Sequence, residues 1–279
     1  MSNLHKHYVQ TSRGLVHAQE AGDGPTLVLV TLTSFAPPLL ETVLPGLAKR
    51  GWRALSLDLM GYGRSDKRGT QWLVEDFADN ILEAIAASGA EPVGLICGHF
   101  SSWTGIEIAA RHPAVVPSLR GLVLDGTPRY TPAQRTELQR SGPPAPQIWD
   151  EQGTHALAYW QKVWRILQKL DPDRPLDAVP AQRFRQAVMA LMEASVFEPN
   201  TAMAAAQFAI EQKLPLVDLP TLVMCSDTDW NLPHHDGIVA ALRHAHSLRL
   251  PGVNPLHDLH SPLRGDEYAE HLHRYFSSL

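Results

Sequence analysis

Short, continuous apolar runs recur along most of the chain, separated by stretches with a different hydrophobic period. The runs lie at residues 26–31, 51–58, 91–98, 119–125, 219–225 and 247–251. Runs of this length are typical of strands buried on both faces of a parallel sheet. The opening residues 7–19 alternate around a Ser12-Arg13-Gly14 turn, which predicts an edge hairpin.

Between these runs the apolar residues follow a helical period. From 71 to 88 they recur three or four positions apart, at Leu73, Phe77, Ile81, Leu82 and Ile85, which predicts a helix with one face in the core. Further helical stretches occupy 38–49, 103–112, 235–244 and 266–278. Strands and helices in this alternation predict a doubly wound, mostly parallel α/β sheet.

The alternation stops between residues 130 and 213. Helical stretches broken at the Pro-rich segments 141–146 and 170–175 fill this region, without a convincing strand. We therefore predict a core of residues 1–129 and 214–279, with a helical insertion at 130–213 over the sheet edge. For Trp149, Trp160 and Trp164 in the insertion, packing against the core is a simpler explanation than ligand contact.

Composition restricts the partners of this chain. Its 279 residues are 44% hydrophobic, enough for a sizeable core, and carry a net charge of −5. Because there is no long Lys/Arg run, nucleic acid and anionic membranes are unfavourable partners. We expect a small-molecule substrate of apolar or aromatic character. The oligomeric state stays open, a homodimer included.

Neither disulfides nor a targeting segment are expected. Cys97 and Cys225 each end a predicted strand, unlike a disulfide framework or a metal-binding repeat. Residues 1–8 hold no apolar signal core, and no stretch approaches the ~20 apolar residues that cross a bilayer, so a cytoplasmic location is the default. Gly61 and Gly63 mark a tight turn but lack the full Gly-x-Gly-x-x-Gly pattern of a dinucleotide site.

The candidate chemistry begins where the apolar run at 91–98 stops, in the sequence Cys-Gly-His-Phe-Ser-Ser at 97–102. Chains that place a reactive side chain on a sharp strand-turn-helix usually write Gly-x-Ser-x-Gly, since small flanking residues let strand and helix approach closely. With Cys97 as the first small residue, His99 is central. With Gly98 first, Phe100 would be central and the following helix one residue short. We prefer the register with His99 at the tip.

A histidine at this turn predicts different chemistry from a serine. A serine hydroxyl needs an adjacent base. A neutral imidazole, with a pKa near ~6.5, can itself accept a proton from water or substrate, or attack an activated acyl group. The alternative is that His99 is only a polar turn residue.

The order of these parts resembles the α/β-hydrolase superfamily over nearly the whole chain. The matching segments are residues 24–30, 58–66, 97–102, 109–113, 122–126 and 220–223, followed by Asp229. The resemblance implies an α/β-hydrolase fold with a helical cap, residues 130–213, inserted after the sixth strand and shaping the substrate pocket. The turn at His99 is similar to that of a small branch with a non-serine residue at the nucleophile position. That branch also writes Gly-Ser/Thr-His ahead of a Trp, as at 153–155 and Trp160 here.

The resemblance also implies site residues after the later strands. Asp229 matches the acid after the seventh strand, and Asp125, after the sixth, is the alternative acid. The family's Gly-His motif for the catalytic histidine is absent. His257 is the nearest candidate for that role and His260 the second.

An oxyanion hole and substrate contacts complete the implied site. Where the family has His-Gly after its third strand, this chain has Thr31-Leu32. The backbone amides of Leu32 and Phe100 can still stabilise an oxyanion, because amides act irrespective of the side chain. The residues expected to contact substrate are Thr31, Trp103, Trp160, Trp164 and Trp230.

Together these features favour an enzyme that hydrolyses a small ester, a lactone or a C–C bond next to a carbonyl. His99 would act as general base or nucleophile, preferably as base, sharing acid–base duties with His257 while Asp229 orients an imidazole. One alternative is a cofactor-independent lyase or oxygenase acting by proton abstraction, and another is a silent ligand-binding protein. A metal held by His99, His257 and Asp229 has little support without a His-x-x-x-His spacing, so we predict no metal and no cofactor.

Overall fold

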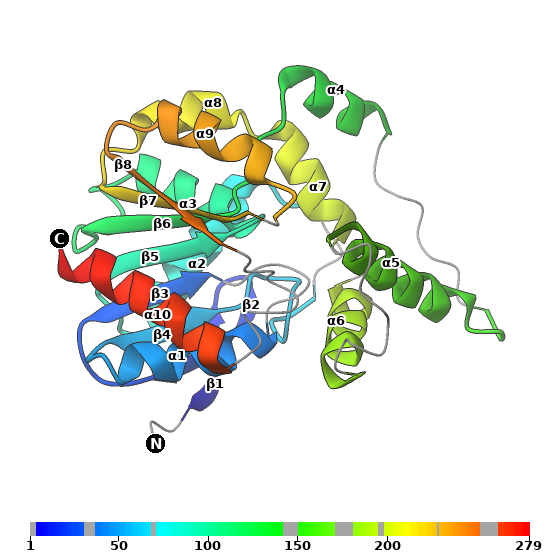
Figure 1. The fold of residues 1–279 in the computed structure, drawn as a ribbon, viewed down its shortest axis with the longest axis horizontal. Helices are drawn as coiled ribbons and strands as arrows, with labels where there is room; N and C mark the ends of the chain where they lie inside the picture. Colours follow the sequence, from blue (N-terminus) through cyan, green and yellow to red (C-terminus); the bar gives the residue numbers. More distant parts are fainter. Residues whose placement is uncertain are drawn as a thin grey trace.

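The structure is a computed structural model that describes residues 4–30, 37–67, 71–141, 150–170, 181–194, 198–227, 229–251 and 262–279. The strands are β1 (His5–Thr11), β2 (Gly14–Ala21), β3 (Thr26–Val30), β4 (Arg53–Leu57), β5 (Pro92–Gly98), β6 (Gly121–Asp125), β7 (Thr221–Ser226) and β8 (Ala245–Leu250). They form one eight-stranded sheet in the order β1-β2-β4-β3-β5-β6-β7-β8. β1 and β2 pair antiparallel at one edge, and β3 to β8 run parallel (Figure 1). The predicted doubly wound, mostly parallel sheet is thus confirmed.

The central parallel strands β3, β5, β6 and β7 are largely apolar and buried because helices cover both faces of the sheet. Successive residues of β3 enter opposite cores: Leu27 and Leu29 lie in one, Val28 and Val30 in the other. The first core is closed by α1 (Pro37–Ala48) and α10 (Pro262–Ser277), which cross one face in Figure 1. The second is closed by α2 (Val74–Ala87), α3 (Ser101–Ala110) and α9 (Leu232–Ala241).

One residue of the predicted helical face lies outside the core. Phe77, Ile81 and Ile85 are buried as expected, but Leu73 is 39% exposed. The reason is that α2 begins at Val74, so Leu73 is the N-cap residue with an extended backbone (φ −88°, ψ 168°). Its side chain therefore does not share the helical face.

The described residues between β6 and β7 form helices and no strand. The helices are α4 (Pro132–Ser141), α5 (Thr154–Leu170), α6 (Ala181–Ala194), α7 (Glu198–Gln207), α8 (Ile210–Lys213) and a 3₁₀ turn at Leu214–Leu216. Figure 1 shows α4, α5, α6 and α7 beyond one side of the sheet. Polar contacts join this segment to the sheet core, among them a hydrogen bond from Tyr62 Oη to Thr201 Oγ1 (2.9 Å) and the approach of Lys213 Nζ to Glu107 Oε2 (2.7 Å).

Two tryptophans of this segment pack within it. Trp160 of α5 contacts Trp164 one turn away and Phe184 of α6, with ring centroids 6.5 and 5.4 Å apart. Tyr159 and Val163 are the buried residues of the same small cluster. These aromatics thus join α5 to α6, where we expected packing against the core. Trp149 lies outside the described residues.

Among the described helices, none is long and apolar enough to cross a membrane.

A close contact fixes the helix that follows β5. A Cβ added at Gly105 of α3 would lie 2.6 Å from the Sγ atom of Cys97 in β5. Both residues are buried. The absence of a side chain at Gly105 therefore lets α3 lie directly against β5, which sets the angle of the turn between them.

We predict that Gly105→Ala destabilises the fold by about 1–3 kcal/mol, the usual cost of overpacking a core. Adding Cys97→Ala removes the sulfur atom in the way and should recover part of that loss. Urea unfolding of the wild type, both single variants and the double variant measures these free energies. Strictly additive effects would contradict the contact.

Candidate active site

The turn between β5 and α3 is centred on His99. Its backbone has φ 51°, and it is the one non-glycine residue in the described ranges with a positive φ. This conformation is uncommon for residues with a side chain, though histidine adopts it more often than most. The His99 N–H donates to the Asp125 carbonyl (2.8 Å), and the Ser102 N–H to the His99 carbonyl (3.0 Å). The tip of the turn is thus His99 rather than Phe100.

The small residues around His99 serve the turn itself. Ser101 Oγ accepts from the Gly98 N–H (2.9 Å) and lies 3.0 Å from the Val30 carbonyl oxygen. Ser101 and Ser102 are completely buried. Burial also raises the pKa of the Cys97 thiol far above its usual value. These groups consequently offer no accessible nucleophile beside His99.

His99 pairs with the carboxylate that follows β7. Its Nε2 atom lies 2.8 Å from Asp229 Oδ2, and the two side chains are 20% and 3% exposed. The pairing is possible because β5, β6 and β7 are parallel neighbours, so their carboxyl ends reach the same edge of the sheet. A single histidine thus occupies the turn and contacts the acid directly.

Neighbouring backbone holds Asp229 in place. Its Oδ1 atom accepts from the Asn231 N–H (2.7 Å), while Asn231 Nδ2 donates to the Gly126 carbonyl (2.8 Å). A Cβ at Gly126 would lie 2.8 Å from Asp229 Oδ2 and 2.9 Å from His99 Nε2. Gly126 has φ 56°, a conformation that favours glycine, and a side chain at this position would also clash with the pair. Both reasons favour glycine here.

The charges of the site favour a protonated imidazole. Burial lowers the pKa of His99, but the hydrogen bond and charge of Asp229, with the charge of Asp125, outweigh it and raise the pKa. Because the folded pKa lies above the unfolded value of ~6.5, the pair stabilises the fold below that pH, and the contribution is lost as pH rises through the folded pKa.

Asp125 occupies a different position from Asp229. Its Oδ2 atom accepts a hydrogen bond from Tyr268 Oη (2.8 Å), so α10 reaches the edge of the site. Burial raises the pKa of Asp125 to about 6, and the negative charge of Asp229 adds to this increase. The charge of His99 and the hydrogen bond from Tyr268 act in the opposite direction and lower the pKa. Of the two predicted acids, Asp229 contacts the imidazole and Asp125 acts on it through its charge.

The hydrogen bond to Asp229 fixes the tautomer of neutral His99. A carboxylate only accepts, so Nε2 must carry the proton, and Nδ1 keeps a free lone pair. Across the described ranges no hydrogen bond to Nδ1 is recorded. The chemically useful nitrogen of His99 is therefore Nδ1, a proton acceptor.

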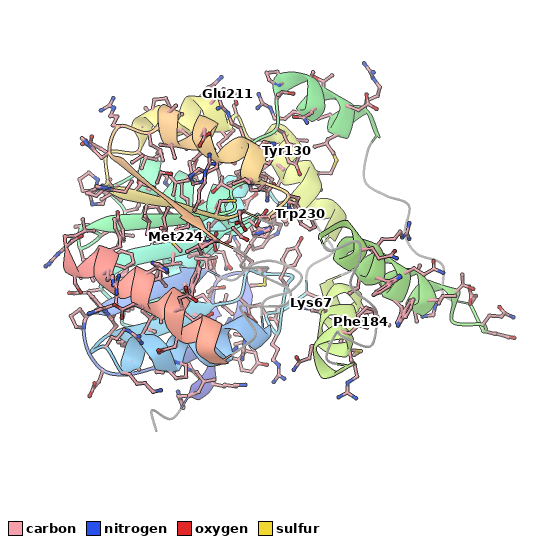
Figure 2. The ribbon with its side chains drawn as sticks, viewed as in Figure 1. Lys67, Tyr130, Phe184, Glu211, Met224 and Trp230 are labelled. Carbon is pink, nitrogen blue, oxygen red and sulfur yellow. The ribbon has the colours of Figure 1, made fainter. Side chains whose placement is uncertain are left out.

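The predicted substrate-contacting tryptophans divide into three groups. Trp230, labelled in Figure 2, follows Asp229 and meets His99 edge to face, with centroids 5.9 Å apart. Trp103 is buried and donates from Nε1 to the Pro128 carbonyl (3.0 Å). Trp160 and Trp164 lie with Phe184, which Figure 2 labels away from Trp230. Only Trp230 contacts His99 in this part of the structure.

Several predicted site residues lie outside the described residues: Thr31, Leu32, His257 and His260. Phe100, the other predicted oxyanion donor, is the N-cap residue of α3. Its amide begins a helix whose N-terminus carries partial positive charge, which suits a developing oxyanion. Within the described segments no acceptor is recorded for that amide.

Sequence reasoning missed three residues around the pair. Asn231 holds Asp229 through its backbone amide, and Gly126 leaves room for the Asp229 carboxylate. Tyr268 donates a hydrogen bond to Asp125. The helical period of residues 266–278 does not reveal the role of Tyr268, since a tyrosine on an apolar helix face has the same period as a leucine. The Asp-Gly pair at 125–126, directly after a strand, was a usable signal for a tight turn.

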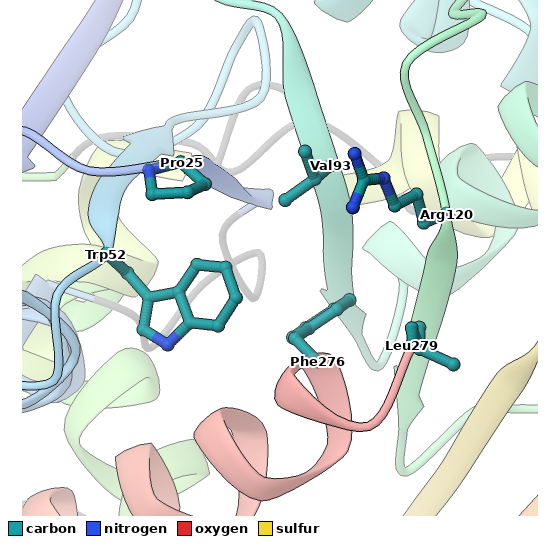
Figure 3. Close-up of a pocket in the computed structure, with 6 residues that line it drawn as sticks. All are labelled: Pro25, Trp52, Val93, Arg120, Phe276 and Leu279. Atoms are coloured by element: carbon teal, nitrogen blue, oxygen red, sulfur yellow. The ribbon is translucent and has the colours of Figure 1, made fainter.

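A cavity of about 140 Å³ lies at the opposite end of the sheet (Figure 3). It is lined by Pro25, Trp52, Val93, Arg120, Phe276 and Leu279. Four of these residues stand at or just before the amino ends of parallel strands. Because ligands of such sheets bind outside the carboxyl ends, this cavity is separate from the site at His99.

Comparison with known proteins places the chain in a family. A family model described as the alpha/beta hydrolase fold matches residues 38–243. The chain therefore belongs to the α/β-hydrolase fold family. A haloalkane dehalogenase from Mycobacterium marinum is 28% identical over 128 residues, which is 42% of this chain but only 37% of that protein.

Solved structures of the same fold cover almost the whole chain. A hydrolase from Pseudomonas aeruginosa has a TM-score of 0.72 at 20% identity, over 96% of this chain and 98% of that one. The enol-lactonase from Burkholderia xenovorans has a TM-score of 0.69 at 17% sequence identity, and the match covers 98% of this chain and 100% of that one. Potato (Solanum tuberosum) epoxide hydrolase I has a TM-score of 0.75 at 14% sequence identity, and the match covers 99% of this chain and 100% of that one. At these identities the likeness shows the fold.

We predict that His99 titrates above ~6.5, the ordinary value for histidine, and that Asp229→Asn lowers its pKa by removing the neighbouring negative charge. Side-chain NMR of ¹³C/¹⁵N-histidine protein over a pH series measures both values. His244, which directly precedes β8 and lies beside Asp218 rather than Asp229, is the internal control. An unchanged His99 titration in Asp229→Asn would contradict the pairing.

Proposed function

We propose that this chain is an enzyme that hydrolyses a small ester, a lactone or a C–C bond next to a carbonyl, with His99 as general base. The observation that carries the proposal is the 2.8 Å contact between His99 Nε2 and Asp229 Oδ2 at the strand-helix turn. A base oriented by a carboxylate is the arrangement that general base catalysis needs, and the described hydroxyl groups that follow the turn, on Ser101 and Ser102, are buried.

Base catalysis is favoured over nucleophilic attack by His99. Because Nε2 donates to Asp229, the lone pair available for chemistry is on Nδ1. Nδ1 adjoins the ring carbon that carries the side chain, which hinders formation of an acyl-imidazole. Proton transfer from water tolerates this crowding, so activated water is the nucleophile in this scheme.

Groups for the remaining steps are proposed from the family resemblance. The amides of Leu32 and Phe100 would stabilise the oxyanion, and His257 would return a proton to the leaving group, with His260 as the second candidate. General acid–base catalysis supplies ~10²–10⁴-fold on its own. Positioning of the substrate must supply much of the remaining rate.

Residues 130–213 are proposed as the cap that positions the substrate. The segment is joined to the core through Tyr62 and Thr201 and through Lys213 and Glu107. Trp230 places an aromatic ring beside His99 and is 39% exposed, which suits an apolar or aromatic substrate. Trp103 would act indirectly, by holding the loop at Pro128.

A second candidate function uses the same base. Ser101 and Ser102, the hydroxyl residues that follow the turn, are buried and so are not exposed nucleophiles, which favours chemistry that begins with proton abstraction by His99. A cofactor-independent lyase or oxygenase would use His99 to deprotonate an activated hydroxyl or aromatic substrate. This candidate differs from hydrolysis in its products, and an oxygenase consumes oxygen.

The test is a substrate screen with esters, lactones and 1,3-diketones, with oxygen consumption monitored. His99→Asn is the informative variant, because asparagine tolerates a positive φ but cannot act as a base. We expect it to lower kcat by ~10²–10⁴-fold. His244→Asn, at an exposed histidine at the other end of the sheet, should leave turnover unchanged.

Three results separate the possibilities. Turnover unchanged in His99→Asn would overturn the base role. Oxygen uptake with a diketone or aromatic substrate would favour the second candidate. Absence of any turnover would support a ligand-binding protein on this scaffold.

We also predict an acid limb in the pH–rate profile. The base must be neutral, so activity should fall as pH drops through the raised pKa of His99. Asp229→Asn lowers that pKa and should move the limb to lower pH while reducing kcat. Initial rates over pH 5–9 measure both effects. A limb that stays in place in Asp229→Asn would argue against His99 as the titrating base.

A further inference from the structure

A cluster of metal-binding side chains lies on the edge hairpin, outside the candidate active site. In β1, His5 and His7 are two positions apart and therefore face the same side of the strand. In the antiparallel register His5 pairs with Glu20 of β2, and His7 pairs with the small Ala18. The hairpin thus gathers two imidazoles and one carboxylate.

The three side chains converge closely. Nδ1 of His5 and Nδ1 of His7 lie 3.6 and 4.0 Å from the same oxygen, Glu20 Oε1. The two rings stack with centroids 5.0 Å apart, and all three ligand atoms lie within 4.8 Å of one another. A Zn²⁺ ion bonded at ~2.0–2.2 Å needs its ligand atoms roughly 3–4 Å apart, so small side-chain shifts would complete the site.

Two further observations favour a cation at this place. His7 Nδ1 is buried, and the described residues give it no hydrogen-bond partner, which leaves a costly unsatisfied group. Glu20 is already oriented: Oε2 accepts from Arg53 Nε (2.9 Å) while Oε1 faces the histidines. Arg53 thus plays the part of the outer residues that fix a metal-binding carboxylate.

We propose that His5, His7 and Glu20 form a binding site for a divalent first-row transition metal ion, with Zn²⁺ as the ion best matched. Two imidazoles and one carboxylate suit Zn²⁺, Ni²⁺ and Cu²⁺, whereas Mg²⁺ and Ca²⁺ prefer oxygen ligands. The side chains are 68%, 26% and 22% exposed, so the ion enters directly from solvent. Water would complete its coordination.

A bound ion would bridge β1 and β2 at the open end of the hairpin. β1 is the outermost strand and pairs only with β2 in the sheet order. Because the ion binds the folded hairpin more tightly than the unfolded chain, it would stabilise the native state. The site lies on the antiparallel edge, whereas His99 follows β5 within the parallel part, so the two are independent.

The test is calorimetric titration of the untagged full chain with ZnCl₂ in excess Mg²⁺. We expect one Zn²⁺ per chain at this site. His7→Ala should bind Zn²⁺ at least ~10–100-fold more weakly, because removing a metal ligand lowers the affinity at least as much as removing a residue that only orients a ligand. Glu20→Gln should also weaken binding. His244→Ala removes an exposed histidine elsewhere and should bind as the wild type does.

Two controls keep the result interpretable. Circular dichroism shows whether His7→Ala is folded, and histidine NMR in the wild type should show Zn²⁺ shifting the His5 and His7 signals. His99→Ala should retain the Zn²⁺ affinity. Equal affinity in the wild type and His7→Ala, loss of binding in His99→Ala, or no Zn²⁺ binding would each overturn the proposal.

Discussion

The hydrogen bond between His99 and Asp229 is the interaction on which the arrangement of the site depends. It requires a histidine held at φ 51° on the turn after β5, and a carboxylate carried to the same edge by β7. Gly126 leaves room between them, and the Asn231 amide holds the carboxylate. In the proposed mechanism the base would therefore contact the acid directly and would need no second imidazole to do so.

The fold was predictable because its central strands are buried on both faces. The run at residues 26–31 is continuously apolar, which is typical of a strand buried on both faces. Its residues 26–30 form β3 in the structure, and the side chains of β3 divide between the two cores. The ends of amphipathic helices were predicted less exactly. Leu73 fits the helical period of α2 yet stays outside it, because a period does not show where the first helical turn begins.

The partners within the site were less predictable, for a physical reason. Asp125 and Asp229 are the same residue type at the ends of adjacent strands, and the chain order does not say which carboxylate turns toward the imidazole. That choice depends on loop geometry: the Asn231 backbone amide orients Asp229, whereas Tyr268, distant in sequence, donates a hydrogen bond to Asp125. The roles of His257 and Leu32 remain predictions.

A double-mutant cycle tests directly whether His99 and Asp229 act as one unit. It compares kcat/KM for the wild type, His99→Asn, Asp229→Asn and the double variant on the substrate that the screen identifies. Because Asp229 acts through the imidazole in this account, removing it from His99→Asn should change kcat/KM less than about twofold, as is typical of residues that act together. Multiplication of the two single losses in the double variant would contradict the account.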